Sequence, residues 1–203
     1  STDVVAESVG RERPAIATHA APDGTVTIMF SDIEDSTVLT ESLGDQAWQE
    51  LLGKHNALIR EQIRAHDGFE VKTMGDGFMV AFQSAGKALA CAAAIQTALA
   101  ERNVSAEEPV KVRMGMHAGE VIKEGEDFFG RNVIMAARVA SQASGGEVLV
   151  SSVLKGLLAG SDVAWGEART VALKGLSGEH EIWNVEWSGP GRGRRRERRA
   201  RPR

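Results

Sequence analysis

The feature that most constrains this fold is a pair of apolar runs, FEVKTM and GFMVAF, that meet around Gly75-Asp76-Gly77. Apolar and β-branched residues in short runs predict strands. A Gly-Asp or Asp-Gly pair between two such runs predicts a tight β-hairpin, and the strands of a hairpin are antiparallel. We therefore expect an antiparallel sheet in the core of the protein.

The other apolar runs alternate between strand and helix periodicity. Residues 25–31 predict a buried strand, and apolar residues at helical spacing predict one helix from Thr37 to about His66. Gly44 and Gly53 weaken that helix without forbidding it. Further along, we expect a helix over 84–103, one or two strands over 110–125, a helix over 130–143, a strand over 147–151, a short helix over 152–160, and strands over 163–173 and 179–187.

This order, βαββαβ followed by αβαββ, predicts an α+β fold. Its first half matches the ferredoxin-like, palm-type core, an antiparallel-rich sheet with two helices on one face. The second half adds a C-terminal αβ extension, so that helices flank the sheet. Proteins of different function share this core, so the fold by itself does not define an activity.

Composition and charge separate a central domain from two ends. We expect residues 1–23 to be a linker, 24–187 to be one domain, and 188–203 to be a disordered tail. Residues 191–203 hold eight Arg and one Glu, or +7, and removing this from the net charge of −4 leaves −11 for the rest. Such a tail suits nucleic acid or anionic lipid, but we favour a solvated end and expect no specific nucleic-acid partner.

No run of residues resembles a membrane span or a secretory signal. A span needs about 20 apolar residues, and no stretch approaches this length. The first 24 residues lack the apolar region of a signal peptide. The one cysteine, Cys91, lies in an Ala-rich helical run and has no partner for an internal disulfide. A reducing, cytoplasmic location fits this composition.

Three carboxylates, Asp32, Glu34 and Asp35, crowd the end of the first predicted strand. Asp35 or Ser36 is a good N-cap, and the preference of a helix N-terminus for acidic residues explains Asp35 and would extend to Glu34. Asp32 directly follows the strand and needs a cation. In a βαββ core it can converge with Asp76 of the hairpin, which taken alone is an ordinary turn residue. Two hard carboxylates without His or Cys suit Mg²⁺ or Mn²⁺ together with water and substrate phosphates.

Several motifs, taken in order, then point to a family. FSDIEDST places Asp32 44 residues ahead of the Asp of GDGF, and VRMGMHAG and DFFGRNVIMAARV follow. Over residues 25–187 the sequence resembles the catalytic domain of class III nucleotidyl cyclases, of the bacterial type. The resemblance implies an adenylate cyclase, a phosphorus-oxygen lyase of signal transduction. It would convert ATP to 3′,5′-cyclic AMP and pyrophosphate by in-line attack of the ribose 3′-hydroxyl on the α-phosphate.

The resemblance also implies a role for each matching residue. Asp32 and Asp76 match the metal-binding aspartates, with the Ile33 carbonyl as a further ligand, for two Mg²⁺ or Mn²⁺ ions. Arg138 matches the arginine that stabilises the transition state. In the family the metal ligands come from one subunit and the base-selecting residues from the other. The resemblance therefore implies a head-to-tail homodimer with ATP at the interface.

The remaining matches concern the substrate. Arg113 and Lys174 match residues that bind the phosphates, and Lys72 and Asp127 match the purine-selecting pair. A lysine donates and an aspartate accepts, which complements N1 and N6 of adenine and opposes the pattern of guanine. The alternative for this pair is a solvent-facing strand lysine and a helix-capping aspartate.

One departure from the family weakens the prediction of activity. Where the family helix reads V-N-x-A-x-R, this chain reads VIMAAR, so that Ile134 replaces an Asn that aligns the ribose. Asn132 lies two residues earlier and points roughly 200° away on a helix. A catalytically weak or inactive nucleotide-binding or regulatory module is therefore the alternative function. His55, His66 and His117 show no metal-ligand spacing, and we interpret His117 as structural.

Overall fold

The computed structural model describes residues 24–120 and 130–188. The predictions for the linker 1–23, for all but the first residue of the tail 188–203, and for Asp127 lie outside these residues. The described elements are β1 (Thr25–Ile33), α2 (Ser36–Leu43), α3 (Asp45–Ala65), β2 (Phe69–Met74), β3 (Gly77–Phe82), α4 (Ala85–Asn103), β4 (Val112–Glu120), α5 (Gly130–Ser141), β5 (Val148–Ser151), α6 (Ser152–Leu157), β6 (Trp165–Ala172) and β7 (Glu179–Val185).

The described strands form one seven-stranded sheet in the order β2-β3-β1-β4-β5-β7-β6. The pairs β2–β3, β3–β1 and β1–β4 are antiparallel, and β4 pairs in parallel with β5. The first four strands have the order of a ferredoxin-like core, and the last three extend it. The predicted α+β class and its C-terminal extension are confirmed.

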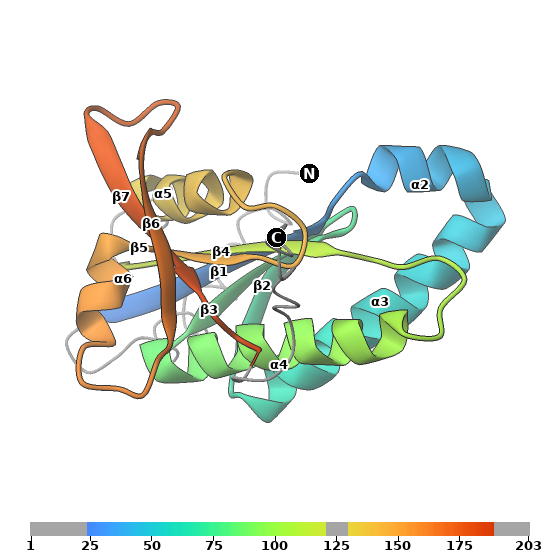
Figure 1. The fold of residues 1–203 in the computed structure, drawn as a ribbon, viewed down its shortest axis with the longest axis horizontal. Helices are drawn as coiled ribbons and strands as arrows, with labels where there is room; N and C mark the ends of the chain where they lie inside the picture. Colours follow the sequence, from blue (N-terminus) through green and yellow to red (C-terminus); the bar gives the residue numbers. More distant parts are fainter. Residues whose placement is uncertain (1–23, 121–129, 189–203) are drawn as a thin grey trace, which may run out of the picture.

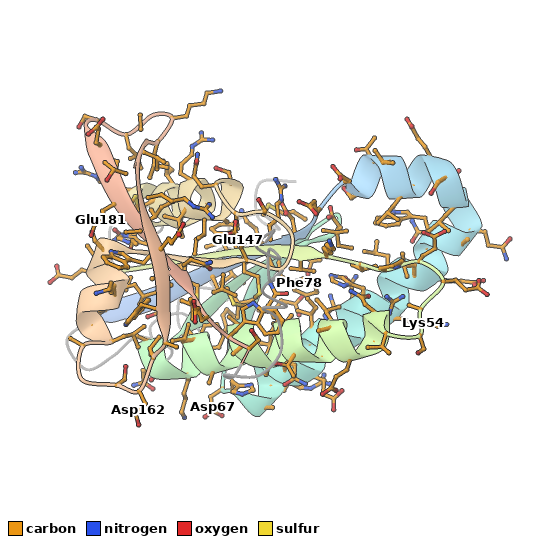
Figure 2. The ribbon with its side chains drawn as sticks, viewed as in Figure 1. Lys54, Asp67, Phe78, Glu147, Asp162 and Glu181 are labelled. Carbon is orange, nitrogen blue, oxygen red and sulfur yellow. The ribbon has the colours of Figure 1, made fainter. Side chains whose placement is uncertain are left out.

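Helices cover the two faces of this sheet (Figure 1). α3 and α4 pack together along one face, and α5 lies on the other, against β4 and β1. The main core fills the first interface with side chains such as Phe78, Ile59 and Ile95. A smaller cluster under α5 contains Ile28 and Ala136. In Figure 2, Phe78 lies centrally between the sheet and the helices, whereas charged side chains project from the periphery.

The chain from Thr37 to His66 is two helices, so the prediction of one continuous helix is wrong. Gly44 separates α2 from α3 with φ 79° and ψ 165°, a conformation that glycine adopts without the steric cost paid by other residues. Its N–H still bonds to the Thr40 carbonyl and closes the last turn of α2. Gly53 remains inside α3.

No helix among residues 24–120 and 130–188 is long and apolar enough to cross a membrane.

Candidate active site

The tip of the β2–β3 hairpin lies against the end of β1 (Figure 1), and this contact builds the site. Gly75 takes the first position of the two-residue turn with φ 61°, where glycine is favoured. The Ile33 N–H donates to Asp76 Oδ2 at 2.7 Å. A Cβ on Gly77 would lie 3.0 Å from the Ser31 carbonyl oxygen, so glycine permits the close approach of hairpin and strand. Asp76 is therefore bonded to the residue next to Asp32.

Arg113 is the cationic partner of Asp32. The two residues face each other in the β1–β4 register. Arg113 Nε and Nη2 each donate to an Asp32 oxygen at 2.7 Å, a bidentate ion pair. These hydrogen bonds raise the pKa of the Arg113 guanidinium, and the negative charges of Asp32, Glu34 and Asp76 raise it further. The cation that the sequence required at Asp32 is thus supplied by the neighbouring strand.

Glu34 and Asp35 do not cap α2 as their position in the sequence suggested. Glu34 Oε1 accepts from the Gly145 N–H at 2.9 Å, which ties the end of β1 to the loop before β5. Asp35 takes the N-cap position, but its side chain makes no capping hydrogen bond. Its φ of 54° is uncommon for a residue other than glycine. Asp35 therefore holds the N-cap position without a side-chain capping bond, and Glu34 bonds to Gly145.

The oxygen atoms at the end of β1 suit a divalent cation that binds together with the phosphates of a substrate. Within the described chain, no group of three or more His, Cys, Asp or Glu residues is arranged to hold a metal ion. Asp32, Asp76 and the Ile33 carbonyl offer oxygen ligands, and Mg²⁺ typically uses one or two carboxylates with water and substrate phosphates. Both oxygens of Asp32 accept from Arg113, and the remaining lone pairs of the carboxylate are left for a cation.

The other predicted site residues lie apart from this cluster. No hydrogen bond or ion pair of the described residues links Lys72, Arg138 or Lys174 to Asp32 or Asp76. Lys72 is exposed on β2, and Lys174 is exposed in the turn after β6. Arg138 is half-buried on α5, and its Nε has no hydrogen-bond partner among the described residues.

Ile134, which stands at the departure from the family pattern, lies on the same helix face as Arg138, since four residues separate them. Its side chain is 45% exposed. Asn132 points elsewhere, to His117 and to the Glu120 carbonyl. Asn132 is thus engaged with β4, which agrees with the interpretation that it is a poor substitute for an asparagine at position 134. The alternation of Gly115, His117 and Gly119 along β4 is the sequence signal for this contact with α5.

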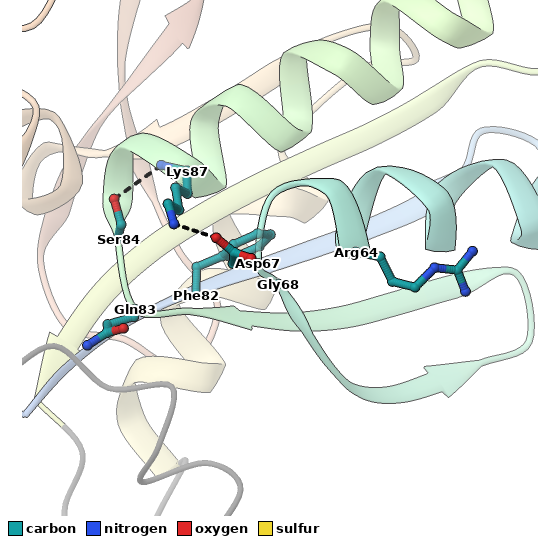
Figure 3. A pocket seen from close by; sticks show the side chains of 7 residues that line it. All are labelled: Arg64, Asp67, Gly68, Phe82, Gln83, Ser84 and Lys87. Carbon is teal, nitrogen blue, oxygen red and sulfur yellow. Dashed lines mark hydrogen bonds and ion pairs between the residues drawn. The ribbon is translucent and has the colours of Figure 1, made fainter.

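A pocket lies at the other end of β3 (Figure 3). It is lined by Arg64, Asp67, Gly68, Phe82, Gln83, Ser84 and Lys87. Lys87 pairs there with Asp67, and Ser84 caps α4 through the Lys87 N–H. Six residues of strand separate this pocket from Asp76, about 20 Å at the usual rise per residue. The pocket is therefore separate from Asp32 and Asp76.

Comparison with known proteins identifies the family. Residues 18–186 match the model of the adenylate and guanylate cyclase catalytic domain, and the chain belongs to this family. An adenylate cyclase of Podospora anserina is 38% identical over 157 residues, which are 65% of this chain and 7% of that protein. An adenylate cyclase of Mycosarcoma maydis is 34% identical over 190 residues, which are 79% of this chain and 7% of that protein. The chain thus spans a small part of these relatives.

Solved structures agree with this assignment. An adenylate cyclase of Trypanosoma brucei, described in its monomeric state, is 28% identical with a TM-score of 0.71, covering 85% of this chain and 93% of that one. The guanylyl cyclase Cya2 is 28% identical with a TM-score of 0.72, covering 79% and 91%. The adenylyl cyclase CyaB of P. aeruginosa is 27% identical with a TM-score of 0.68, covering 79% and 93%. The curated relatives above are fungal, so the bacterial type stays a prediction.

Proposed function

We propose that residues 24–187 form an adenylate cyclase domain that converts ATP to 3′,5′-cyclic AMP and pyrophosphate. The observation that carries this proposal is the hydrogen bond from Ile33 to Asp76, which brings two carboxylates distant in sequence to one strand end. The family includes adenylate and guanylate cyclases, and the curated relatives named above are adenylate cyclases. Because the chain covers 7% of those relatives, the proposal concerns this domain.

In the proposed reaction the ribose 3′-oxygen attacks the α-phosphorus in line. The bond to the bridging oxygen breaks, pyrophosphate leaves, and the 3′-hydroxyl proton passes to solvent. Arg138 stabilises the negative charge that develops on the phosphoryl oxygens, and Arg113 and Lys174 bind the triphosphate. The displacement needs no covalent intermediate with the protein.

Asp32, Asp76 and the Ile33 carbonyl would hold two divalent cations, Mg²⁺ or Mn²⁺. When bound, such ions lower the pKa of the attacking hydroxyl and neutralise the triphosphate. Arg113 has two roles in this scheme. Its Nε and Nη2 pair with Asp32, and its remaining N–H groups are left to bind phosphate.

Base selection would rest on Lys72 and Asp127. Lys72 donates to N1 of adenine, and Asp127 accepts from N6. The exposed position of Lys72 on β2, an edge strand of the sheet, leaves its ammonium free to meet a nucleotide. Guanine would place its N1 donor against the Lys72 ammonium and its O6 acceptor against the Asp127 carboxylate. A mismatched polar pair of this kind costs about 1–3 kcal/mol.

The domain would act as a head-to-tail homodimer. Arg138 has no hydrogen bond or ion pair to Asp32 or Asp76 of its own chain, which agrees with the shared sites that the family resemblance implies. Cys91 is buried and free, which suits the reducing cytoplasm where we expect the enzyme to act.

The alternative, a cyclase-like module that binds nucleotide without turnover, is favoured by Ile134. Purified protein incubated with ATP and Mn²⁺ should yield cyclic AMP and pyrophosphate in equal amounts, separated by chromatography. GTP should yield far less product. Asp76→Ala should abolish turnover, while Asp67→Ala, an exposed aspartate outside the site, should not. Nucleotide binding by calorimetry without product would support the alternative.

A further inference from the structure

The strand β4 presents a row of three residues to α5. Gly115, His117 and Gly119 alternate along the strand and therefore face the same side. A Cβ on Gly115 would lie 2.1 Å from the Ala140 backbone nitrogen, and a Cβ on Gly119 would lie 2.1 Å from Asn132 Nδ2. Gly115 is therefore needed for α5 to lie this close, and Gly119 leaves room for the Asn132 side chain. His117 lies between these two contacts.

His117 is 7% exposed and belongs to a chain of hydrogen bonds whose direction can be assigned. The Glu120 carbonyl can only accept, so Asn132 Nδ2 donates to it, at 3.0 Å. Asn132 Oδ1 then faces His117 Nε2 at 3.2 Å, and the ring must donate there. On its other side, His117 Nδ1 lies 2.7 Å from Ser151 Oγ.

The donors and acceptors of the hydrogen bonds at Ser151 can be assigned in the same way. Its Oγ accepts from the Leu154 N–H at 3.2 Å as the N-cap of α6, which leaves its hydroxyl proton for His117 Nδ1. The neutral imidazole with its proton on Nε2 thus satisfies every group of the chain. Burial lowers the pKa of His117, against the opposing effect of the Asn132 hydrogen bond, and this favours the neutral ring.

We propose that His117, as the Nε2–H tautomer, is a positioning residue for the cyclase reaction. It locks the first turn of α5 onto β4 through Asn132, and α5 carries Ile134 and Arg138. This inference rests on the proposed function, since it assigns Arg138 to the reaction. Without the lock, α5 is held by the Gly115–Ala140 contact and its apolar face, and it can tilt about that contact.

A tilt of the helix would misplace groups that act in the transition state. Ile134 lies six residues, about 9 Å along the helix, from the Ala140 contact, and Arg138 lies two residues, about 3 Å, from it. A misplacement of about 1 Å can cost 100-fold in rate. Asn132→Ala and His117→Ala should therefore lower kcat by about 10- to 100-fold and leave KM for ATP within about threefold, as expected for groups that act in the transition state. A purely structural role would instead lower the melting temperature and leave kcat per folded molecule unchanged.

The matched control is His55→Gln. His55 is also a buried histidine, 4% exposed, but it lies on α3, on the opposite face of the sheet. This variant should keep wild-type kcat. If Asn132→Ala also keeps wild-type kcat, the proposal is overturned. Asn132→Ala serves as the second variant in case His117→Ala does not fold.

Two further measurements on the full chain do not depend on turnover. Nitrogen-15 NMR of the histidine rings should show His117 neutral at pH 7 with its proton on Nε2. A proton on Nδ1, or a charged ring, would overturn the proposal. Hydrogen exchange of α5 amides should accelerate at least tenfold in Asn132→Ala while α4 is unchanged, and equal exchange would also overturn it. If the wild type made no cyclic AMP, the proposed function would fail, and these two measurements would still decide whether His117 locks α5.

Discussion

Replacing His55 by leucine should stabilise the fold, and more at pH 5 than at pH 7.5. His55 lies on α3 where it packs on α4, and it is 4% exposed. Neither ring nitrogen has a hydrogen-bond partner among the described residues. Burial lowers the pKa of His55 from 6.5 to about 4, with a further contribution from the positive charge of Arg102. The folded protein therefore holds this ring neutral where the unfolded chain protonates it.

The sign and size of the effect follow from these two pKa values. At pH 7.5, above both pKa values, the ring is almost entirely neutral in both states, and the fold has nearly its full stability. As the pH falls from 6.5 towards 4, the unfolded chain binds a proton that the folded protein does not, and stability is lost. At pH 5 this loss is about 2 kcal/mol relative to pH 7.5. Leucine also removes two unpaired nitrogens, a gain of about 1 kcal/mol at any pH.

Urea unfolding of wild type and His55→Leu at pH 7.5, 6 and 5 measures this difference directly. The stability advantage of the variant should rise from about 1 kcal/mol at pH 7.5 to about 3 kcal/mol at pH 5. Contributions from the other titrating groups cancel in the difference between the two proteins. An advantage that stays constant with pH would refute the reasoning, because His55 would then titrate alike in the folded and unfolded states.

Further predictions concern the ribose contact, base selection and the C-terminal tail. Ile134→Asn should raise kcat by at most about tenfold and change KM less, since one polar contact contributes about 1–1.5 kcal/mol. Initial rates and melting temperature on one preparation check this, and a stable variant without a rate gain would mean that another group orients the ribose. Lys72→Glu with Asp127→Ala should lose ATP cyclisation and gain GTP use, and unchanged ATP kinetics would exclude these residues from base selection. Removing 189–203 should leave activity within about threefold, because a charged, apolar-poor tail adds nothing to the core, and a collapse of activity would show that it docks.

Local patterns in the sequence were sufficient for much of the fold. The strands over 69–74 and 77–82 coincide with the prediction, because hairpin turn chemistry and strand composition act over a few residues. The single helix predicted from Thr37 to His66 is instead divided into two helices at Gly44. Glycine within a helical pattern can remain in the helix, as Gly53 does, or end it, and the pattern of apolar residues does not distinguish the two.

The contacts of the site that follow from strand order could be predicted from the sequence, whereas those that depend on strand register could not. The meeting of Asp32 with the Asp76 hairpin follows from the strand order of a βαββ core. The pairing of Asp32 with Arg113 depends on the alignment of β1 with β4, across 81 residues, and a shift of one residue would have separated them. The contact of Glu34 with Gly145 likewise joins segments that have no local relation.

Subunit mixing tests the central claim, that ATP is cyclised at sites shared by two copies of the chain. Asp32→Ala and Arg138→Ala should each lower kcat by about 100- to 1,000-fold. After subunit exchange of equal amounts, half of the dimers would be mixed, each with one intact site, so about a quarter of wild-type activity should return.

A mixture of Asp32→Ala with Asp76→Ala is the matched control and should stay inactive, because both changes fall in the same half of the site. Native mass spectrometry of each mixture establishes that mixed dimers are present. Recovery of about a quarter of wild-type cyclic AMP production in the first mixture and none in the control is the result that we predict. Mixed dimers without any recovery would contradict the shared site.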